Sequence, residues 1–304
     1  MPRWAIWGGS DATTVDAVAD RVRDAAGLGL DAIWFPQTAS LDVLSALAVA
    51  GREVEGIALG TAVVPIQGRH PIPLAQQALT VADAVGPGRL TLGIGVTHAP
   101  VSEGWYGIPY RQVVALCREE LQALQGLLGP EHRADVVGEH LTARITLPLT
   151  GPPPGLVVAA LGPKMLELAG RFADGTVTWM TGPRTLARSV VPGLRRAADA
   201  AGRPEPRVIV GLPVCVTSDP DGARERLAPV MAGTAQMASY RRMVDAEGVG
   251  EPVDLALVGD VDAVGERLVG LVDAGATEVL ANVVGDEGER ARTRALLQTL
   301  AAGA

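Results

Sequence analysis

The sequence of 304 residues contains little cysteine, few aromatic residues and a single lysine. Its two cysteines, Cys117 and Cys215, can form no framework of disulfides and have no metal-ligand spacing, so we predict no metal site. Basic residues number 26 against 34 acidic ones, a net charge of -8. Because phosphate backbones are bound by clustered lysine and arginine, this balance argues against nucleic acid as a partner.

Long apolar runs are also missing. No run reaches the length of about 18 residues that a transmembrane helix needs, so we expect no membrane partner. The N-terminus, MPRWAIWGGSD, lacks the apolar stretch of a signal peptide. These absences predict a soluble, intracellular protein of the cytoplasm.

The residues that are present favour a folded chain with a large core. Hydrophobic residues make up 48% and charged residues 20% of the chain, which is far from a disordered composition. The length suits one barrel-type domain of about 200 to 250 residues with insertions. We therefore predict one domain over residues 1–304.

Short apolar segments alternate with helical patterns along most of the chain. They are continuous apolar runs, as expected of parallel strands that are buried on both faces. The predicted strands are Trp4 to Trp7, Ala32 to Phe35, Ile57 to Val64, Leu90 to Ile94, Leu156 to Ala160, Thr176 to Met180, Val208 to Val216 and Glu278 to Val284. Eight β–α units predict an α/β fold, a (β/α)8 TIM barrel. The alternative is an open doubly wound sheet, although WGGSD after the first strand does not supply its GxGxxG turn.

Two segments exceed the bare repeat, at approximately 96–155 and 217–257. The first includes PLTGPPPG, and in the second Pro229 interrupts a helical stretch. We interpret both as insertions at the C-terminal rim of the barrel, where they would cover a substrate pocket.

The strongest local signal is AALGPKMLELAG, residues 159–170. A buried strand ends at Gly162, Pro163 takes the first helical turn, and the free amides of that turn can hold an anion. Lys164, the only lysine of the chain, adds a positive charge there. The turn predicts a phosphate site, and the alternative is an ordinary β–α loop with an exposed lysine.

Two further segments follow predicted strands. LGTAVVPIQGRHP, residues 59–71, combines Gly60 and Pro65 and indicates a strand that bends near its end. LGIGVTHAPVSEGWYGIPY, residues 92–110, has glycines that allow close backbone approach, followed by His98. Each has a purely structural alternative, a strand-end turn in the first and an ordinary loop histidine in the second.

Together these segments, with GLDAIWFPQ and GLPVCVTSDP, give the chain a resemblance to a known family. It resembles the luciferase-like monooxygenase superfamily, in particular the actinobacterial type of oxidoreductase that uses the deazaflavin coenzyme F420. The resemblance extends over nearly the whole chain and implies the same barrel, and a homodimer. It also implies a bulge in the third strand with a non-prolyl cis peptide beneath the deazaflavin ring, here at Ala62–Val63.

The resemblance also implies the site residues. His98, Gln37 and Glu103 are the candidates for catalysis. The implied cofactor-binding residues are Gln37, Thr61, Ala62, Val63, Val64, His98, Ala160, Leu161, Gly162, Pro163, Lys164, Met165 and Thr178. Many F420 enzymes carry an Asp-His pair where this chain has Gln37 and Thr38, and neither of these can act as an acid or base near neutral pH.

The implied function is hydride transfer between C5 of F420 and a small organic substrate, with reduction of an unsaturated C=C or C=N compound favoured. One alternative is an FMN-dependent luciferase-like monooxygenase. A second is a catalytically silent barrel that binds F420.

Overall fold

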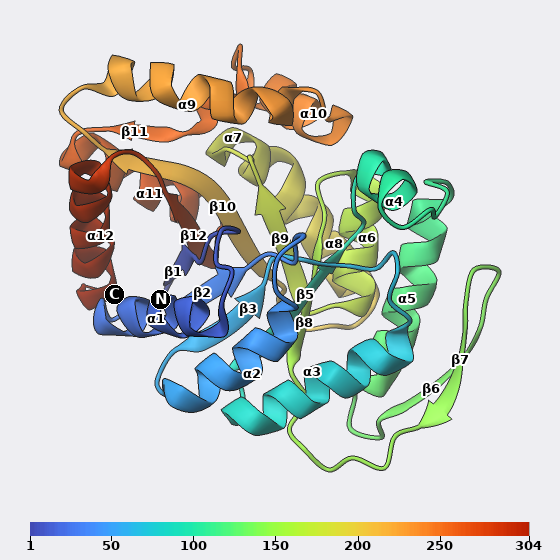
Figure 1. Cartoon of the computed structure of the whole chain (residues 1–304). Coiled ribbons are helices and arrows are strands. Elements are labelled where there is room, and N and C mark those ends of the chain that lie inside the picture. The colour runs from blue at the N-terminus through green and yellow to red at the C-terminus, as the bar shows by residue number, and fades with distance from the viewer. Residues whose placement is uncertain (304) are drawn as a thin grey trace.

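Eight parallel strands close into a barrel in the computed structural model, which describes residues 1–303 (Figure 1). Each barrel strand pairs with the next along the chain, and the pairings of β9 with β10 and of β12 with β1 close the ring. This closure confirms the predicted TIM barrel over the open sheet. The barrel strands are β1 (Arg3–Trp7), β2 (Ala32–Phe35), β3 (Ala58–Thr61), β5 (Leu90–Gly95), β8 (Gly155–Ala159), β9 (Gly175–Trp179), β10 (Arg207–Val216) and β12 (Glu278–Val283).

Helices follow the strands and cover the outside of the barrel (Figure 1). Side chains cap several of them, for example Asp42 before α2 and Asp260 before α11, where a carboxylate accepts a first-turn N–H. The main outer helices are α1 (Val15–Gly27), α2 (Val43–Glu53), α3 (Pro71–Val85), α5 (Val113–Leu127), α6 (Pro163–Phe172), α8 (Val191–Ala200), α11 (Val261–Asp273) and α12 (Glu287–Ala302).

The hydrophobic core has two parts. The larger part lies between the strands and the surrounding helices. A smaller cluster fills the barrel and includes Trp34, Ile209 and Leu280, with Val63 and Ala159 packed against it. The barrel is therefore a packed core, and a ligand can enter only at an end of the strands.

The two predicted extra segments contain elements of their own. The first contains α4 (Ala99–Gly104), the barrel helix α5 and the antiparallel hairpin of β6 (Arg133–Val137) and β7 (Thr142–Thr146). The second contains α9 (Pro220–Ala235), α10 (Ala238–Glu247), a 3-10 turn at Pro252–Leu255 and β11 (Leu257–Gly259). The remaining short elements are β4 (Val64–Pro65), α7 (Pro183–Thr185) and a π-helical turn at Leu186–Val190. The hairpin and β11 have no counterpart among the strands that the sequence predicts.

Residues 1–303 lack two features that would bear on the site. None of the helices there combines the length and apolar character that a membrane crossing requires. The same residues contain no group of three or more His, Cys, Asp or Glu side chains placed to hold a metal ion.

Candidate active site

A cleft of about 570 Å³ opens at the carboxyl ends of the barrel strands. It is lined by the segments that follow β2, β3, β5 and β8, by the first turn of α5, and by α10. In this fold the carboxyl ends of the strands carry the active site, so this cleft is the candidate.

The floor of the cleft is built where β3 bends. The peptide bond between Ala62 and Val63 is cis, as the resemblance implies, and Val63 lines the cleft. Glycines on the neighbouring strand make room for this bend. A Cβ atom on Gly93 would lie 1.9 Å from the carbonyl oxygen of Thr61, and one on Gly95 would lie 2.8 Å from Cγ2 of Val63. The predicted close backbone approach at these glycines is confirmed, and it leaves a small apolar surface facing the cleft.

The first turn of α6 forms one wall. Gly162 is the N-cap and offers no side-chain cap, Pro163 begins the helix, and both line the cleft with Lys164 and Met165. The first N–H groups of a helix have no intrahelical partner, so the amides of Lys164 and Met165 are available to a ligand. The amides, the helix dipole and the lysine ammonium together favour an anion such as a phosphate.

The opposite wall brings together His98, at the N-cap of α4, and Tyr240 of α10. Their ring centroids lie 5.6 Å apart and the rings are inclined by 57°. Burial lowers the pKa of His98, so its imidazole is neutral at pH 7, and burial raises the pKa of Tyr240. Both groups can therefore offer hydrogen bonds to a ligand without adding charge.

The charge of the lining has one sign. Among the described residues that line the cleft, Lys164 and Arg242 carry full charges and no aspartate or glutamate is present. Tyr110 also lines it, and burial raises the pKa of that phenol. The cleft therefore suits an anionic ligand that has a flat apolar part over Val63.

The structure brings most of the predicted cofactor residues to this cleft, but not all of them. Those that line it are Gln37, Val63, His98, Leu161, Gly162, Pro163, Lys164 and Met165. Those outside its lining are Thr61, Ala62, Val64, Ala160 and Thr178. Thr61 and Thr178 are buried and donate their hydroxyls to the carbonyl oxygens of Gly93 and Ile209, because they belong to the packing of the strands.

Two of the predicted catalytic residues have other roles. The amide of Gln37 donates to the carbonyl oxygens of Thr38 and Leu41 and accepts the N–H of Val43 at 2.9 Å, so it holds its own loop onto α2. Glu103 lies outside the cleft lining and accepts the N–H of Tyr110 at 3.0 Å. Of the three, only His98 combines a place in the cleft with a titratable group.

Sequence reasoning missed the contribution of α10. Ser239, Tyr240 and Arg242 line the cleft although they lie far along the chain from the barrel strands that form its floor. The only signal was the length of the segment 217–257, which predicted a cover over the pocket without naming its residues.

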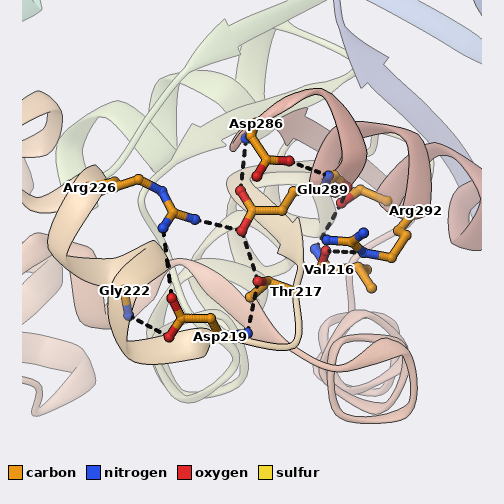
Figure 2. A network of polar contacts seen from close by, with 9 residues as sticks. Val216, Thr217, Asp219, Gly222, Arg226, Asp286, Glu289 and Arg292 are labelled. Carbon is orange, nitrogen blue, oxygen red and sulfur yellow. Dashed lines mark hydrogen bonds and ion pairs between the residues drawn. The ribbon is translucent and has the colours of Figure 1, made fainter.

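On the β10 side the rim is closed by a polar network that we name the Glu289 corner, after Glu289 of α12 (Figure 2). The Glu289 carboxylate accepts hydrogen bonds from the hydroxyl of Thr217 at 2.8 Å, from Arg226 at 2.6 Å and from the N–H of Asp286 at 2.8 Å. Burial would raise the pKa of Glu289, but these hydrogen bonds outweigh it and lower the pKa. The carboxylate is fully used in joining α9, β10 and α12, so it is structural.

The fold and cleft define an α/β-barrel protein with a cleft at the strand ends whose charged lining residues are basic. Comparison with protein families identifies it further: residues 3–278 match the model of the luciferase-like monooxygenase family. The chain belongs to this family.

One curated relative has coenzyme F420 in its name. The chain is 29% identical over 220 residues to the F420-dependent glucose-6-phosphate dehydrogenase of Beutenbergia cavernae, covering 70% of this chain and 64% of that protein. The chain thus spans less than two thirds of that relative.

Solved structures with the same fold include an F420-dependent secondary alcohol dehydrogenase in complex with an F420-acetone adduct. It has a TM-score of 0.81 and 17% identity, and the match covers 97% of this chain and 98% of that chain. Another is the oxygenating constituent of 3,6-diketocamphane monooxygenase of Pseudomonas putida, in complex with FMN. It has a TM-score of 0.74 and 20% identity, and the match covers 99% of this chain and 97% of that chain. These two structures establish the shared fold.

Proposed function

We propose that this chain is an oxidoreductase that uses coenzyme F420 and transfers a hydride between the C5 carbon of the deazaflavin and a small organic substrate. The observation that carries the proposal is the cleft lining, which joins an apolar floor at Val63 to the free first turn of α6 with Lys164. The F420-dependent relative of Beutenbergia cavernae supports the choice of cofactor.

Different residues of the cleft would bind the phosphate of the coenzyme, its ring system and the substrate. Lys164 and the amides of the first turn of α6 would bind the phosphate of the coenzyme. Val63 would support its ring system, which supplies the hydride chemistry when bound. Substrate would lie between the ring and α10, where Tyr240 and Arg242 cover the cleft.

His98 is the residue we assign to the substrate. Its neutral imidazole can donate or accept a hydrogen bond at the reacting group and polarise it. Glu103, one of the catalytic candidates predicted from the sequence, lies outside the cleft lining. Reduction of a C=C or C=N compound would then take its proton from water, with the neutral imidazole of His98 as a hydrogen-bond partner.

The alternative is an FMN-dependent monooxygenase, and it is favoured by the structural similarity to the FMN complex of 3,6-diketocamphane monooxygenase. Titration of the purified chain with oxidised F420 and, in parallel, with FMN decides between the two, with ligand fluorescence as the readout. Preferential binding of F420 supports the proposal. Preferential binding of FMN makes the chain a flavin enzyme, and binding of neither refutes both assignments.

The phosphate contact is tested by Lys164→Ala. We expect F420 affinity to fall by about 10- to 100-fold, the loss of one charge-assisted hydrogen bond. Arg171→Ala is the matched control, because Arg171 is an exposed cation in the last turn of the same helix and lies outside the cleft lining. Equal affinities for the two variants would overturn the phosphate assignment.

A further inference from the structure

A second and larger cleft, of about 920 Å³, is distinct from the candidate active site. It is bounded by residues 66–71 between β4 and α3, by residues 108–112 before α5, by α5 itself and by the turn of the β6–β7 hairpin. We name it the Glu120 cleft, after a residue of α5 that lines it. The proposed function makes no use of it.

Its walls carry buried polar atoms that lack partners. In residues 1–303, the buried side-chain atoms without a hydrogen bond are Nε2 of Gln67, Oε1 of Glu120 and Nε2 of His140. All three residues line the Glu120 cleft. Buried polar groups are almost always hydrogen-bonded, so the collection of all three exceptions in one cleft points to a partner that binds there.

Two adjacent glutamates of α5 differ in whether their carboxyl groups have hydrogen-bond donors. The Glu119 carboxylate accepts the N–H groups of Glu139, His140 and Leu141 at 3.0, 2.8 and 3.1 Å, which fixes the hairpin turn against α5. Glu120 is 1% exposed and its Oε1 has no donor. The turn therefore satisfies one carboxyl group completely and leaves the next one facing the cleft unpaired.

The free groups of the cleft are mainly donors. Gln67 offers amide N–H, and Arg111 is an exposed cation on the lining. Burial raises the pKa of Glu120 to about 8, so at pH 7 its carboxyl group is a neutral O–H donor. The exposed Glu139 is the one other carboxyl group on the lining among the described residues.

We propose that the Glu120 cleft binds a small organic carboxylate, which accepts hydrogen bonds from the Gln67 amide and the Glu120 carboxyl group and pairs with Arg111. The site would communicate with the candidate active site. Oε1 of Gln67 accepts the N–H of Thr97 at 3.0 Å, and Thr97 lines the active-site cleft next to His98. A ligand that holds the Gln67 amide would thereby hold the strand end that carries His98.

Calorimetric titration of the cofactor-free full chain with succinate tests the proposal, with the uncharged succinamide as the control ligand. We expect saturable binding of one succinate per chain at about pH 7 and none of succinamide. Gln67→Leu and Glu120→Leu should each weaken binding by about tenfold or more, the effect of one lost hydrogen bond to a charged ligand. Circular dichroism checks that both variants fold.

Glu120→Gln separates the donor from the charge. It keeps a neutral donor, so succinate should still bind, and binding should persist from about pH 7 to about pH 9 while that of the wild type falls. The other titratable or charged groups of the lining are Arg69, His70, Arg111, Glu139 and His140. Cys117 and Glu119 lie beside Glu120 on α5, and burial raises the pKa of Cys117 to about 12 while hydrogen bonds outweigh burial and lower that of Glu119.

Several outcomes would overturn the proposal. These are no saturable binding of succinate, equal binding of succinamide, or no effect of the substitutions at Gln67 and Glu120. Loss of succinate binding in Lys164→Ala would place the ligand in the active-site cleft instead. A dimer that Arg111→Glu converts to a monomer, measured by light scattering, would show that a second copy of the chain covers the cleft.

Discussion

Glu120 and Glu289 are both almost completely buried, at 1% and 2% exposure, yet their surroundings differ in kind. Glu289 accepts hydrogen bonds from a hydroxyl, a guanidinium and a backbone amide, and it stays ionised (Figure 2). Glu120 has an unpartnered oxygen and a pKa raised to about 8 by burial. Burial alone therefore does not determine the ionisation of a carboxyl group or its contribution to stability, because both depend on the hydrogen-bond donors around it.

The largest effect on stability is expected from removing Glu289, the glutamate whose carboxylate has hydrogen-bond donors. Glu289→Ala leaves Thr217, the N–H of Asp286 and Arg226 without their acceptor, so the free energy of unfolding should fall by about 3 kcal/mol. Urea denaturation followed by circular dichroism measures it. Glu287→Ala, an exposed carboxylate on the same helix, is the control and should change stability by less than about 0.5 kcal/mol. Similar losses in both variants would show that the corner contributes no special stability.

The second effect is a pH dependence at Glu120. Its pKa is raised in the folded state, so its contribution to stability is complete below about pH 4.5 and is lost as pH rises toward about 8. Glu120→Gln removes this titration. The variant should therefore gain on the wild type in free energy of unfolding progressively as the pH rises from about 4.5 to about 8.

Glu289 should give the opposite dependence of stability on pH. Burial raises its pKa, but its hydrogen-bond donors outweigh burial and lower the pKa overall. Its stabilisation is present above the unfolded pKa of glutamate and is lost as pH falls below it. Denaturation of Glu289→Ala against the wild type at acid pH, from about pH 3, measures the trend of Glu289. For Glu120, denaturation curves of Glu120→Gln and the wild type are compared from about pH 4 to about pH 9. A constant difference between the two proteins would refute the role given to Glu120.

The smallest effect concerns the active-site cleft, where His98 is shielded by Tyr240. Tyr240→Ala exposes the imidazole, so the pKa of His98 should rise toward its ordinary value. A titration followed by nuclear magnetic resonance of the histidine ring protons measures it. Arg241→Ala, in the same helix and paired with Asp245, is the control and should leave that pKa unchanged. No shift in Tyr240→Ala would mean that Tyr240 does not desolvate His98.

The fold could be predicted because its signals are local. Each barrel strand is a short apolar run, and parallel strands buried on both faces need no partner information to be found. The hairpin β6–β7 was not predicted because most of its residues are exposed or half-buried and half of them are polar, and β11 was not predicted because it has three residues. Neither leaves a periodic apolar pattern.

Some residues of the candidate site could likewise be predicted from the sequence, and others could not. The GPK turn at Gly162 to Lys164 could be read from the sequence, since a strand end, an N1 proline and a lone lysine lie together in the chain. The sequence could not show that Thr178 lies outside the cleft lining, because polar residues in barrel strands can bond to neighbouring strands as readily as to a ligand. Tyr240 and Arg242 could not be found, because only packing brings α10 over the cleft.

The sequence by itself determined the alternation of strands and helices, the close approach at Gly93 and Gly95, and the start of α6 at Pro163 after an N-cap glycine. Each depends on the conformational limits of a few neighbouring residues. Only the tertiary structure decided which wall faces that turn and what surrounds each buried glutamate. Glu119, Glu120 and Glu289 have the same side chain, and their ionisation depends on donors that come from other elements of the chain.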